Sequence, residues 1–294
     1  MTLSKLSVAQ SSAPHLPNSS SKGLQIADAS SLFPDPWMLT DRIVRPLAVI
    51  GDGDCPPGVT LVGTGKKNVL RGINGSDNLR GGRGNDTLLG KGCQDNLLGE
   101  AGNDRLKGGT QPDRLLGGTG RDGLEGGNGR DDLSGGAGND SLFGGEGDDL
   151  LEGGSGDDRL NGGNGKDSLQ GGVGRDLLVG ASKDDILIGG LDKDRMEGGD
   201  GKDRFVYASF DDRGDAITDF NRREDVIDLS RLIRGSNYSS SDRFERYVIV
   251  ARATDNRTII RVDADGDSGD NPFKTLVTLE DVKYSRVKSN NFVF

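Results

Sequence analysis

The stretch GGNGRDDLSGGAGNDSLFGGEGDDLLE at residues 126–152 decides the fold. It is three copies of one nonapeptide, Gly-Gly-x-Gly-x-Asp-x-Leu-x, and fifteen such units run end to end from residue 72 to residue 206. The sixth position is Asp in all fifteen units, and the eighth is Leu in the first thirteen, followed by Met196 and Phe205. Two positions this regular over so long a stretch indicate a repeat architecture in which each unit packs on its neighbours.

Each unit divides into a turn and a very short strand. The glycines of Gly-Gly-x-Gly-x-Asp permit positive φ and close backbone approach, and x-Leu-x sends one apolar side chain inward. Two units, eighteen residues, make one flattened coil, and stacked coils pair their strands in parallel at a spacing of about 4.8 Å. The sequence therefore predicts an all-β fold, a right-handed parallel β-roll (a nonapeptide-repeat solenoid) with β-rich caps at both ends.

The sixth-position aspartates should line up along both edges of this roll. Like charges at that spacing repel, so a cation is expected between them. Carboxylates and turn carbonyls are hard oxygen ligands of the kind that Ca²⁺ prefers. A metal-free glycine-rich solenoid would leave the invariant Asp without a purpose, and no Gly-x-x-x-x-Gly-Lys-Ser/Thr string supports a phosphate loop. We therefore expect the thin leucine core to fold only when calcium binds.

Successive turns alternate between the two edges, which divides the aspartates into two columns. The first column has nearly intact glycines, interrupted at Glu100 and Asp192. The second is interrupted at Ile73, Lys91, Cys93, Gln111, Ala181 and Lys183. We expect about five good sites in the first column, between Asp86 and Asp176, and about two in the second, among Asp131, Asp149 and Asp167. The candidate calcium ligands are Asp86, Asp104, Asp122, Asp140, Asp158, Asp176 and Asp194 in the first column, and Asp77, Asp131, Asp149, Asp167 and Asp203 in the second.

The sequence is expected to divide into four parts. Residues 1–40 are Ser/Pro-rich and expected to be disordered. Residues 41–71 are expected to form an N-terminal cap, with cap strands at 43–50 and 59–62 and a degenerate repeat that has Asn68 at the Asp position. The roll covers 72–206, and 207–294 is expected to be a β-rich C-terminal cap. Its expected strands are at 214–220 and 224–230, followed by antiparallel strands at 246–253, 257–262 and 275–282.

The composition restricts the partners. A net charge of −10 argues against nucleic acid, and no stretch is long and apolar enough to span a membrane. Two cysteines are no disulfide framework, and the pairing of Cys55 with Cys93 is left open. The fifth position of the repeat is often basic, which indicates either solvated side chains or a row facing anionic glycan or lipid. The residues concerned are Arg121, Arg130, Lys166, Arg175 and Lys202.

The nonapeptide array resembles the RTX (hemolysin-type calcium-binding) family. The tail resembles the region that follows the repeats in serralysin-like and other type I secreted proteins, on residues 214–220, 224–230 and 291–294. The resemblance implies a parallel β-roll whose calcium ions are held by sixth-position aspartates and turn carbonyls. It also implies export by an ABC transporter through an uncleaved C-terminal signal, hence a secreted, extracellular protein. Asn291 departs from this pattern, because such tails often carry an acidic residue there.

Catalysis is not expected. The single histidine, His15, rules out a His-Glu-x-x-His zinc site, no Gly-x-Ser-x-Gly elbow occurs, and residues 1–62 are too short for a catalytic domain. The favoured function is a secreted structural or surface component. The alternative is a calcium-dependent adhesin or glycan-binding module, or a non-catalytic accessory of a secreted hydrolase. Candidate recognition aromatics are Tyr238, Phe244, Tyr247 and Tyr284.

Overall fold

The fold comes from a computed structural model that describes residues 55–232, 248–253, 257–262 and 274–294. The chain divides into two compact units, 1–44 and 45–294, and all the described residues belong to the second. The predicted leader, the predicted strand at 43–50 and the aromatics Tyr238, Phe244 and Tyr247 lie outside the described residues. Among the residues that are described, no helix has the length and hydrophobicity needed to cross a membrane.

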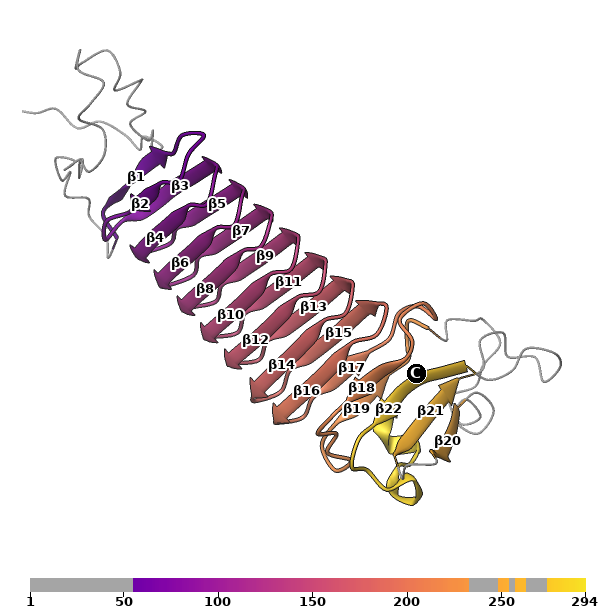
Figure 1. Cartoon of the computed structure of the whole chain (residues 1–294). Helices are drawn as coiled ribbons and strands as arrows, with labels where there is room; N and C mark the ends of the chain where they lie inside the picture. Colours follow the sequence, from indigo (N-terminus) through magenta and orange to yellow (C-terminus); the bar gives the residue numbers. More distant parts are fainter. Residues whose placement is uncertain (1–54, 233–247, 254–256, 263–273) are drawn as a thin grey trace, which may run out of the picture. The chain divides into compact units, whose positions relative to one another are not determined.

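The described residues form two β-sheets whose strands alternate along the chain (Figure 1). In spatial order, the 11-stranded sheet contains β1 (Pro57–Val62), β3 (Ser76–Arg83), β5 (Asn96–Ala101), β7 (Arg114–Thr119), β9 (Asp132–Ala137), β11 (Leu150–Ser155), β13 (Ser168–Val173), β15 (Ile186–Leu191), β17 (Arg204–Val206), β19 (Val226–Asp228) and β23 (Phe292–Val293). The 12-stranded sheet contains β2 (Val69–Arg71), β4 (Thr87–Gly92), β6 (Arg105–Thr110), β8 (Gly123–Asn128), β10 (Ser141–Glu146), β12 (Arg159–Asn164), β14 (Leu177–Ser182), β16 (Arg195–Asp200), β18 (Asp215–Ile217), β22 (Lys274–Leu279), β21 (Thr258–Val262) and β20 (Val248–Arg252).

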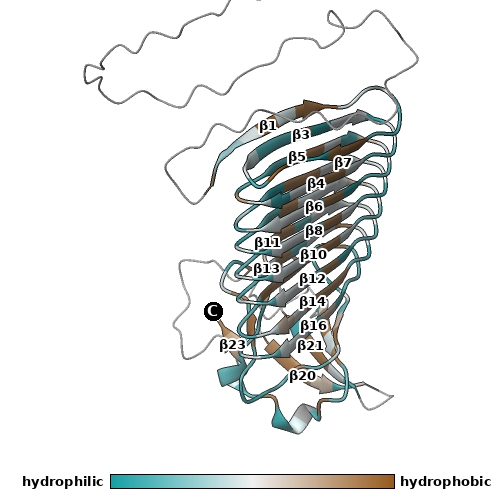
Figure 2. Ribbon diagram, turned by 90° about the vertical axis from the view of Figure 1, so that its left-hand side faces the viewer, coloured by the Kyte–Doolittle hydropathy of each residue, from teal (hydrophilic) through white to brown (hydrophobic). Residues whose placement is uncertain are grey.

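The strands of the repeat region pair in parallel with a constant shift of 18 residues. Leu142 of β10, for example, lies opposite Leu124 of β8 and Leu160 of β12. The eighth-position leucines form one core between the sheets, and none of them is more than 3% exposed. In Figure 2 apolar segments run along the strands, while the turns at the edges are mostly hydrophilic. The predicted all-β parallel roll is therefore confirmed.

The first glycine of each unit is required by space rather than by backbone conformation. A Cβ added at Gly135 would lie 2.5 Å from Oδ2 of Asp140 and 2.7 Å from the carbonyl oxygen of Gly153. The second and fourth positions instead adopt positive φ, as at Gly138 (130°). Where these positions are not glycine, the residue still adopts positive φ and the turn keeps its shape, with the exception of Ile73 in the first unit. The non-glycine residues that adopt positive φ at these positions are Lys91, Cys93, Glu100, Gln111, Ala181, Lys183 and Asp192.

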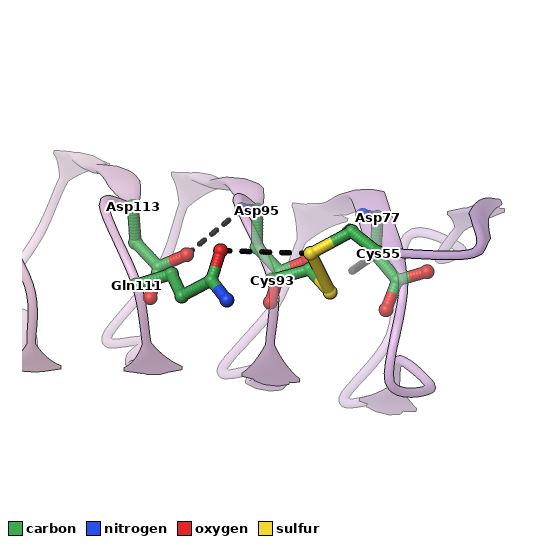
Figure 3. The surroundings of a disulfide bond; sticks show 6 residues. All are labelled: Cys55, Asp77, Cys93, Asp95, Gln111 and Asp113. Carbon is green, nitrogen blue, oxygen red and sulfur yellow. Dashed lines mark hydrogen bonds between the residues drawn. A yellow bond between two sulfur atoms is a disulfide. The ribbon is translucent and has the colours of Figure 1, made fainter. Parts of the chain in front are cut away.

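The N-terminal end of the roll is tied to the repeats in two ways. β1 and β2 pair in parallel with β3 and β4, and the amide of Asn68 donates to Oδ1 of Asp86 at 2.7 Å. Asn68 thus occupies the Asp position of a degenerate unit, as its place in the sequence predicts. Cys55 and Cys93 form a disulfide, which answers the question that the sequence left open (Figure 3). Such a cross-link contributes about 2–4 kcal/mol, mainly by constraining the unfolded chain.

The C-terminal segment begins as a continuation of the roll. β18 and β19 pair in parallel with β16 and β17, and β22 then pairs in parallel with β18. Antiparallel pairing, predicted for the later strands, is confirmed for β20–β21 and β21–β22. Two 3-10 helices, η2 (Tyr284–Arg286) and η3 (Ser289–Asn291), lead to β23, which pairs with β19. The amide nitrogen of Asn291 donates to the carbonyl oxygen of Arg222 at 2.8 Å, a bond that an ionised carboxylate could not donate.

Candidate calcium centre

The sixth-position aspartates form two continuous ladders along the edges of the roll. In each ladder, the backbone amide of one Asp donates to Oδ1 of the Asp 18 residues later, as from Asp122 to Asp140 at 2.8 Å. The turns of the first column connect the 11-stranded sheet to the 12-stranded sheet, and those of the second column connect them in the other direction. None of these aspartates is more than 3% exposed. The repeats thus hold a row of buried carboxylates at each edge.

In every unit except the first, the second carboxylate oxygen of the aspartate, Oδ2, lacks a hydrogen-bond partner among the residues that the structure describes. Oδ2 is buried and accepts no hydrogen bond from the described residues. Because a buried, unpaired carboxylate oxygen carries a large desolvation penalty, each of these atoms points to a missing cationic partner. The aspartates concerned are Asp86, Asp95, Asp104, Asp113, Asp122, Asp131, Asp140, Asp149, Asp158, Asp167, Asp176, Asp185, Asp194 and Asp203.

Backbone carbonyl oxygens lie along the same edges. A Cβ added at Gly120 would be 2.0 Å from the carbonyl oxygen of Gly102, and one at Gly138 would be 1.7 Å from that of Gly120. The fourth-position carbonyl of one turn therefore points at the next turn of the same column. Together with Oδ2, these carbonyls form a set of hard oxygen atoms suited to Ca²⁺ rather than to a soft metal.

Placing these carboxylates together in buried rows raises their pKa values. Burial raises the pKa of Asp122 and Asp158 to about 7, with a smaller contribution from the neighbouring aspartates of the same column. In the second column, burial and then neighbouring carboxylates raise the pKa of Asp113 and Asp185 to about 8. A divalent cation between successive turns would reverse this penalty by favouring the charged form.

The residues present fit calcium if backbone carbonyls supply much of the coordination. Within the described part of the chain, no three His, Cys, Asp or Glu side chains are grouped as metal ligands. This agrees with the ladder, in which each turn offers one carboxylate and the remaining oxygens come from the backbone. A calcium ion accepts six to eight oxygen ligands, and carbonyls serve it as well as carboxylates do.

Eleven of the twelve predicted ligands have a buried Oδ2 without a hydrogen-bond partner in the described chain, and Asp77 is the exception. Asp77 accepts the amide of Val59 on Oδ1 at 2.6 Å and the amide of Ile73 on Oδ2 at 2.7 Å. Both of its oxygens are therefore satisfied by the protein. Conversely, Asp95, Asp113 and Asp185 have the same orphaned Oδ2 but were absent from the sequence-based set. The invariance of the sixth position could have identified them, because the non-glycine residues beside them keep the turn conformation.

The fifth-position residues form a separate, exposed ladder. The backbone amides of Arg121 and Arg175 donate to Oδ1 of Asn103 and Asp157, while the basic side chains themselves are exposed. Lys166 pairs through Nζ with Oδ2 of Asp184 at 2.7 Å. In solvent such a pair contributes little, so this row is a property of the surface.

Fold and site together define a calcium-binding repeat protein built as a parallel β-roll. The family model described as the RTX calcium-binding nonapeptide repeat matches in overlapping stretches, from 60–88 through 71–106, 98–133, 107–142, 125–160, 134–169, 143–178 and 170–205 to 179–213. These stretches span 60–213, more than half of the chain, so the chain belongs to the RTX repeat family. The repeats of this family bind calcium and are generally non-catalytic.

Two solved structures show what the chain is similar to. One is the solution structure of the AlgE6R2 subunit of the Azotobacter vinelandii mannuronan C5-epimerase, at 28% identity, covering 47% of this chain and 88% of that chain, with a TM-score of 0.35. The AlgE6R3 subunit of the same enzyme matches at 29% identity over 50% of this chain and 78% of that chain, with a TM-score of 0.27. These scores are too low to support a structural argument. No curated protein matches the chain.

Proposed function

We propose that this protein is exported unfolded and folds outside the cell when calcium enters the two aspartate columns. The observation that carries this proposal is the row of buried, unpaired Oδ2 atoms from Asp86 to Asp203. A chain with so many buried carboxylates and a core one leucine wide gains stability when a cation neutralises them. Calcium is therefore the trigger of folding rather than a later addition to a finished fold.

The calcium concentration supplies the switch. Extracellular calcium modules bind with Kd of about 10⁻⁴–10⁻³ M, so the sites would stay unfilled at cytosolic calcium. At millimolar calcium each site contributes roughly 1–2 kcal/mol by mass action, and the contributions of many sites add up. The chain would be threadable inside the cell and folded outside it.

Two features of the described residues support export before folding. β23, at the end of the chain, pairs with β19, and Phe292 is only 6% exposed. A transporter that reads this segment must do so before the sheet closes over it. The Cys55–Cys93 disulfide also favours an oxidising compartment, because such bonds persist mainly outside the cytosol.

The role proposed for the folded roll is that of a structural or surface component that acts by binding and not by catalysis. The calcium columns occupy both edges of the repeat region, which leaves the outer faces of the two sheets as its contact surfaces. A glycan-binding role is the alternative outcome: a glycan array probed with calcium-loaded protein should give no ligand if the scaffold role holds.

The direct test is circular dichroism during a calcium titration that starts in EGTA and ends at millimolar calcium, with magnesium as the control. We expect a cooperative change from coil to β structure that magnesium does not produce, since Mg²⁺ demands tighter octahedral geometry and retains its waters. Full β signal already in EGTA would overturn calcium-driven folding. Export is tested separately by expressing the full chain in cells with and without a type I transporter, with a deletion of 287–294 as the negative control.

A further inference from the structure

Each aspartate column has two ends, and three of the four ends are closed by the protein itself. At the start of the first column, Oδ1 of Asn68 accepts the amide of Thr64 at 2.6 Å. At the start of the second, Oδ2 of Asp77 accepts the amide of Ile73. At the finish of the second, Asp225 accepts the amide of Asp203 on Oδ1 at 3.1 Å and that of Asn221 on Oδ2 at 2.6 Å. A nearby backbone amide thus takes the place of a cation at each of these ends.

The fourth end, at Asp215, is open. Asp215 lies beyond the nonapeptide array, yet it continues the first column, because its Oδ1 accepts the amide of Asp194 at 3.0 Å. The spacing is 21 residues here instead of 18, and the family match ends at residue 213. Asp215 is fully buried, and no backbone amide of the described residues donates to its Oδ2 or to that of Asp194.

A buried tyrosine hydroxyl faces this end of the column. Tyr207 is 1% exposed, and its hydroxyl lies within reach of the Asp215 carboxyl. Burial, the charge of Asp215 and a hydrogen bond to it raise the pKa of Tyr207 well above its usual value. One phenol hydroxyl can neutralise neither carboxylate, and Oδ2 of Asp194 has no hydrogen bond from the described residues, so this end of the column still lacks a cationic partner.

Of the other acidic side chains close to this end, Asp212 is already engaged. Oδ2 of Asp212 accepts the amides of Ala208 at 3.1 Å and Ser209 at 2.9 Å, so it caps a local turn. Asp192 stands at a fourth turn position with φ of 82° and contributes further negative charge near Asp194. The open oxygens at this end are therefore those of Asp194, Asp215 and Tyr207, in a strongly negative environment.

We propose that Asp194, Asp215 and Tyr207 form a terminal calcium site that extends the first column beyond the repeats into the C-terminal segment. The proposal rests on the calcium-binding function of the columns. Two carboxylate oxygens and a phenol oxygen, completed by turn carbonyls or water, form a hard oxygen set suited to a large divalent cation. The second column has no such site, because Asp225 is closed.

The site would couple the C-terminal segment to the roll. Asp215 is the first residue of β18, which pairs with β16 of the repeats on one side and with β22 on the other. An ion held between Asp194 and Asp215 therefore joins the last repeat of the first column to the strand on which β22, β21 and β20 are assembled. Binding there makes the order of these strands depend on calcium.

The test compares two substitutions at the matched column ends, Asp215→Asn and Asp225→Asn, in the full chain. The number of calcium ions per folded chain is measured by equilibrium dialysis at millimolar calcium. We expect the Asp215→Asn variant to bind one ion fewer than the unsubstituted protein, and the Asp225→Asn variant to bind the same number. Equal numbers in all three proteins would overturn the terminal site while leaving the rest of the columns intact. An unsubstituted protein that binds no calcium would instead overturn the proposed function.

A second measurement covers the case in which Asp215→Asn fails to fold. Terbium(III) replaces calcium at oxygen sites and emits when a tyrosine close to the ion is excited, so Tyr207 should act as the sensitiser. We expect the terbium-loaded protein to lose most of its tyrosine-excited emission on Tyr207→Phe, while the β signal persists. Emission that is unchanged by Tyr207→Phe would place no ion beside this residue and would overturn the proposal.

Discussion

The first and second aspartate columns have the same ladder of carboxylates but different turns. In the first column, from Asp86 to Asp194, the glycines at the second and fourth positions are nearly complete, so positive φ is adopted at little cost. In the second, Lys91, Cys93, Gln111, Ala181 and Lys183 adopt positive φ, which is unfavourable for residues with a Cβ. The comparison shows that the same aspartate ladder is kept on two different sets of turns, and we propose that the turn residues adjust how well each site binds calcium.

The second column also has partners of its own at its weaker turns. Burial raises the pKa of both Asp77 and Asp167, and the nearby ammonium groups of Lys91 and Lys183, respectively, oppose part of that rise. The Cys55–Cys93 disulfide ties the turn that contains Lys91 to the start of the described chain, with Oε1 of Gln111 at 3.5 Å from Sγ of Cys55 (Figure 3). We therefore expect the first column to depend on calcium more than the second does.

The largest expected effect is that of pH on the calcium-free protein. Burial raises the pKa of Asp113 and Asp185 in the folded protein from the ordinary 3.8 to about 8, and it raises that of other column aspartates such as Asp95, Asp122 and Asp158. The folded state therefore binds protons more tightly than the unfolded chain, so stability is greatest below about pH 4 and is lost as the pH rises towards 8. In EGTA, acidification from pH 8 should increase the β signal in circular dichroism.

With calcium present the direction reverses, which gives the control. Metal-bound carboxylates stay ionised, so protons compete with calcium and its midpoint concentration should rise as the pH falls. A β signal in EGTA that grows with rising pH would contradict this account of the carboxylates.

The next effect concerns the first glycine of a unit. Gly135→Ala would bring a Cβ to within 2.5 Å of Oδ2 of Asp140, so it should destabilise the roll by about 1–3 kcal/mol and weaken calcium binding in the first column. Gly123→Ala is the matched control, because the nearest atom to its Cβ is 4.0 Å away. It should stabilise the roll by about 0.4–1 kcal/mol through the unfolded chain. Urea unfolding with calcium measures both, and equal effects would refute the steric role of the first glycine.

The direct comparison of the columns is Asp140→Asn against Asp95→Asn. Asparagine keeps Oδ1 as an acceptor and removes the charge at Oδ2. Asp140→Asn should lower the calcium-dependent part of the unfolding free energy by about 1–2 kcal/mol for each site it touches. Asp95→Asn should lower it by less, since its unit carries Lys91 and Cys93 in place of glycine. The measurement is urea unfolding in EGTA and in millimolar calcium, and indistinguishable losses would end the distinction between the columns.

The smallest effect should come from repairing a turn of the second column. Lys183→Gly removes a non-glycine residue with φ of 79°, which should stabilise the calcium-loaded roll by about 1 kcal/mol. It also removes a cation that competes with calcium near Asp167. Lys202→Gly is the control, because it removes an exposed charge from the same column without relieving positive φ. A thermal shift that is the same for both variants would show that charge, and not backbone strain, separates the columns.

Much of this architecture could be predicted because the repeat is strict. The 18-residue period follows from two nine-residue units, and the buried leucine column follows from the alternation of x-Leu-x. The degenerate unit at Asn68 was likewise visible, since it keeps the register of the array.

The remaining features depend on contacts that the pattern does not encode. The closure of Asp77 depends on the amides of Val59 and Ile73, and the disulfide depends on where β1 places Cys55. Asp215 breaks the 18-residue spacing, so only its position beside Asp194 reveals it as a member of the column. Nor does the pattern show that an interrupted turn keeps its conformation, as it does where lysine, cysteine or glutamine adopts positive φ.

The central claim is that calcium occupies the gaps beside the orphaned Oδ2 atoms and does so most fully in the first column. A crystal structure of the calcium-loaded full chain tests it directly. The account predicts ions at high occupancy between successive turns from Asp86 to Asp194, and lower occupancy beside Asp95, Asp113 and Asp185. Oδ2 atoms bonded to water or protein groups, with no ion in either column, would contradict it.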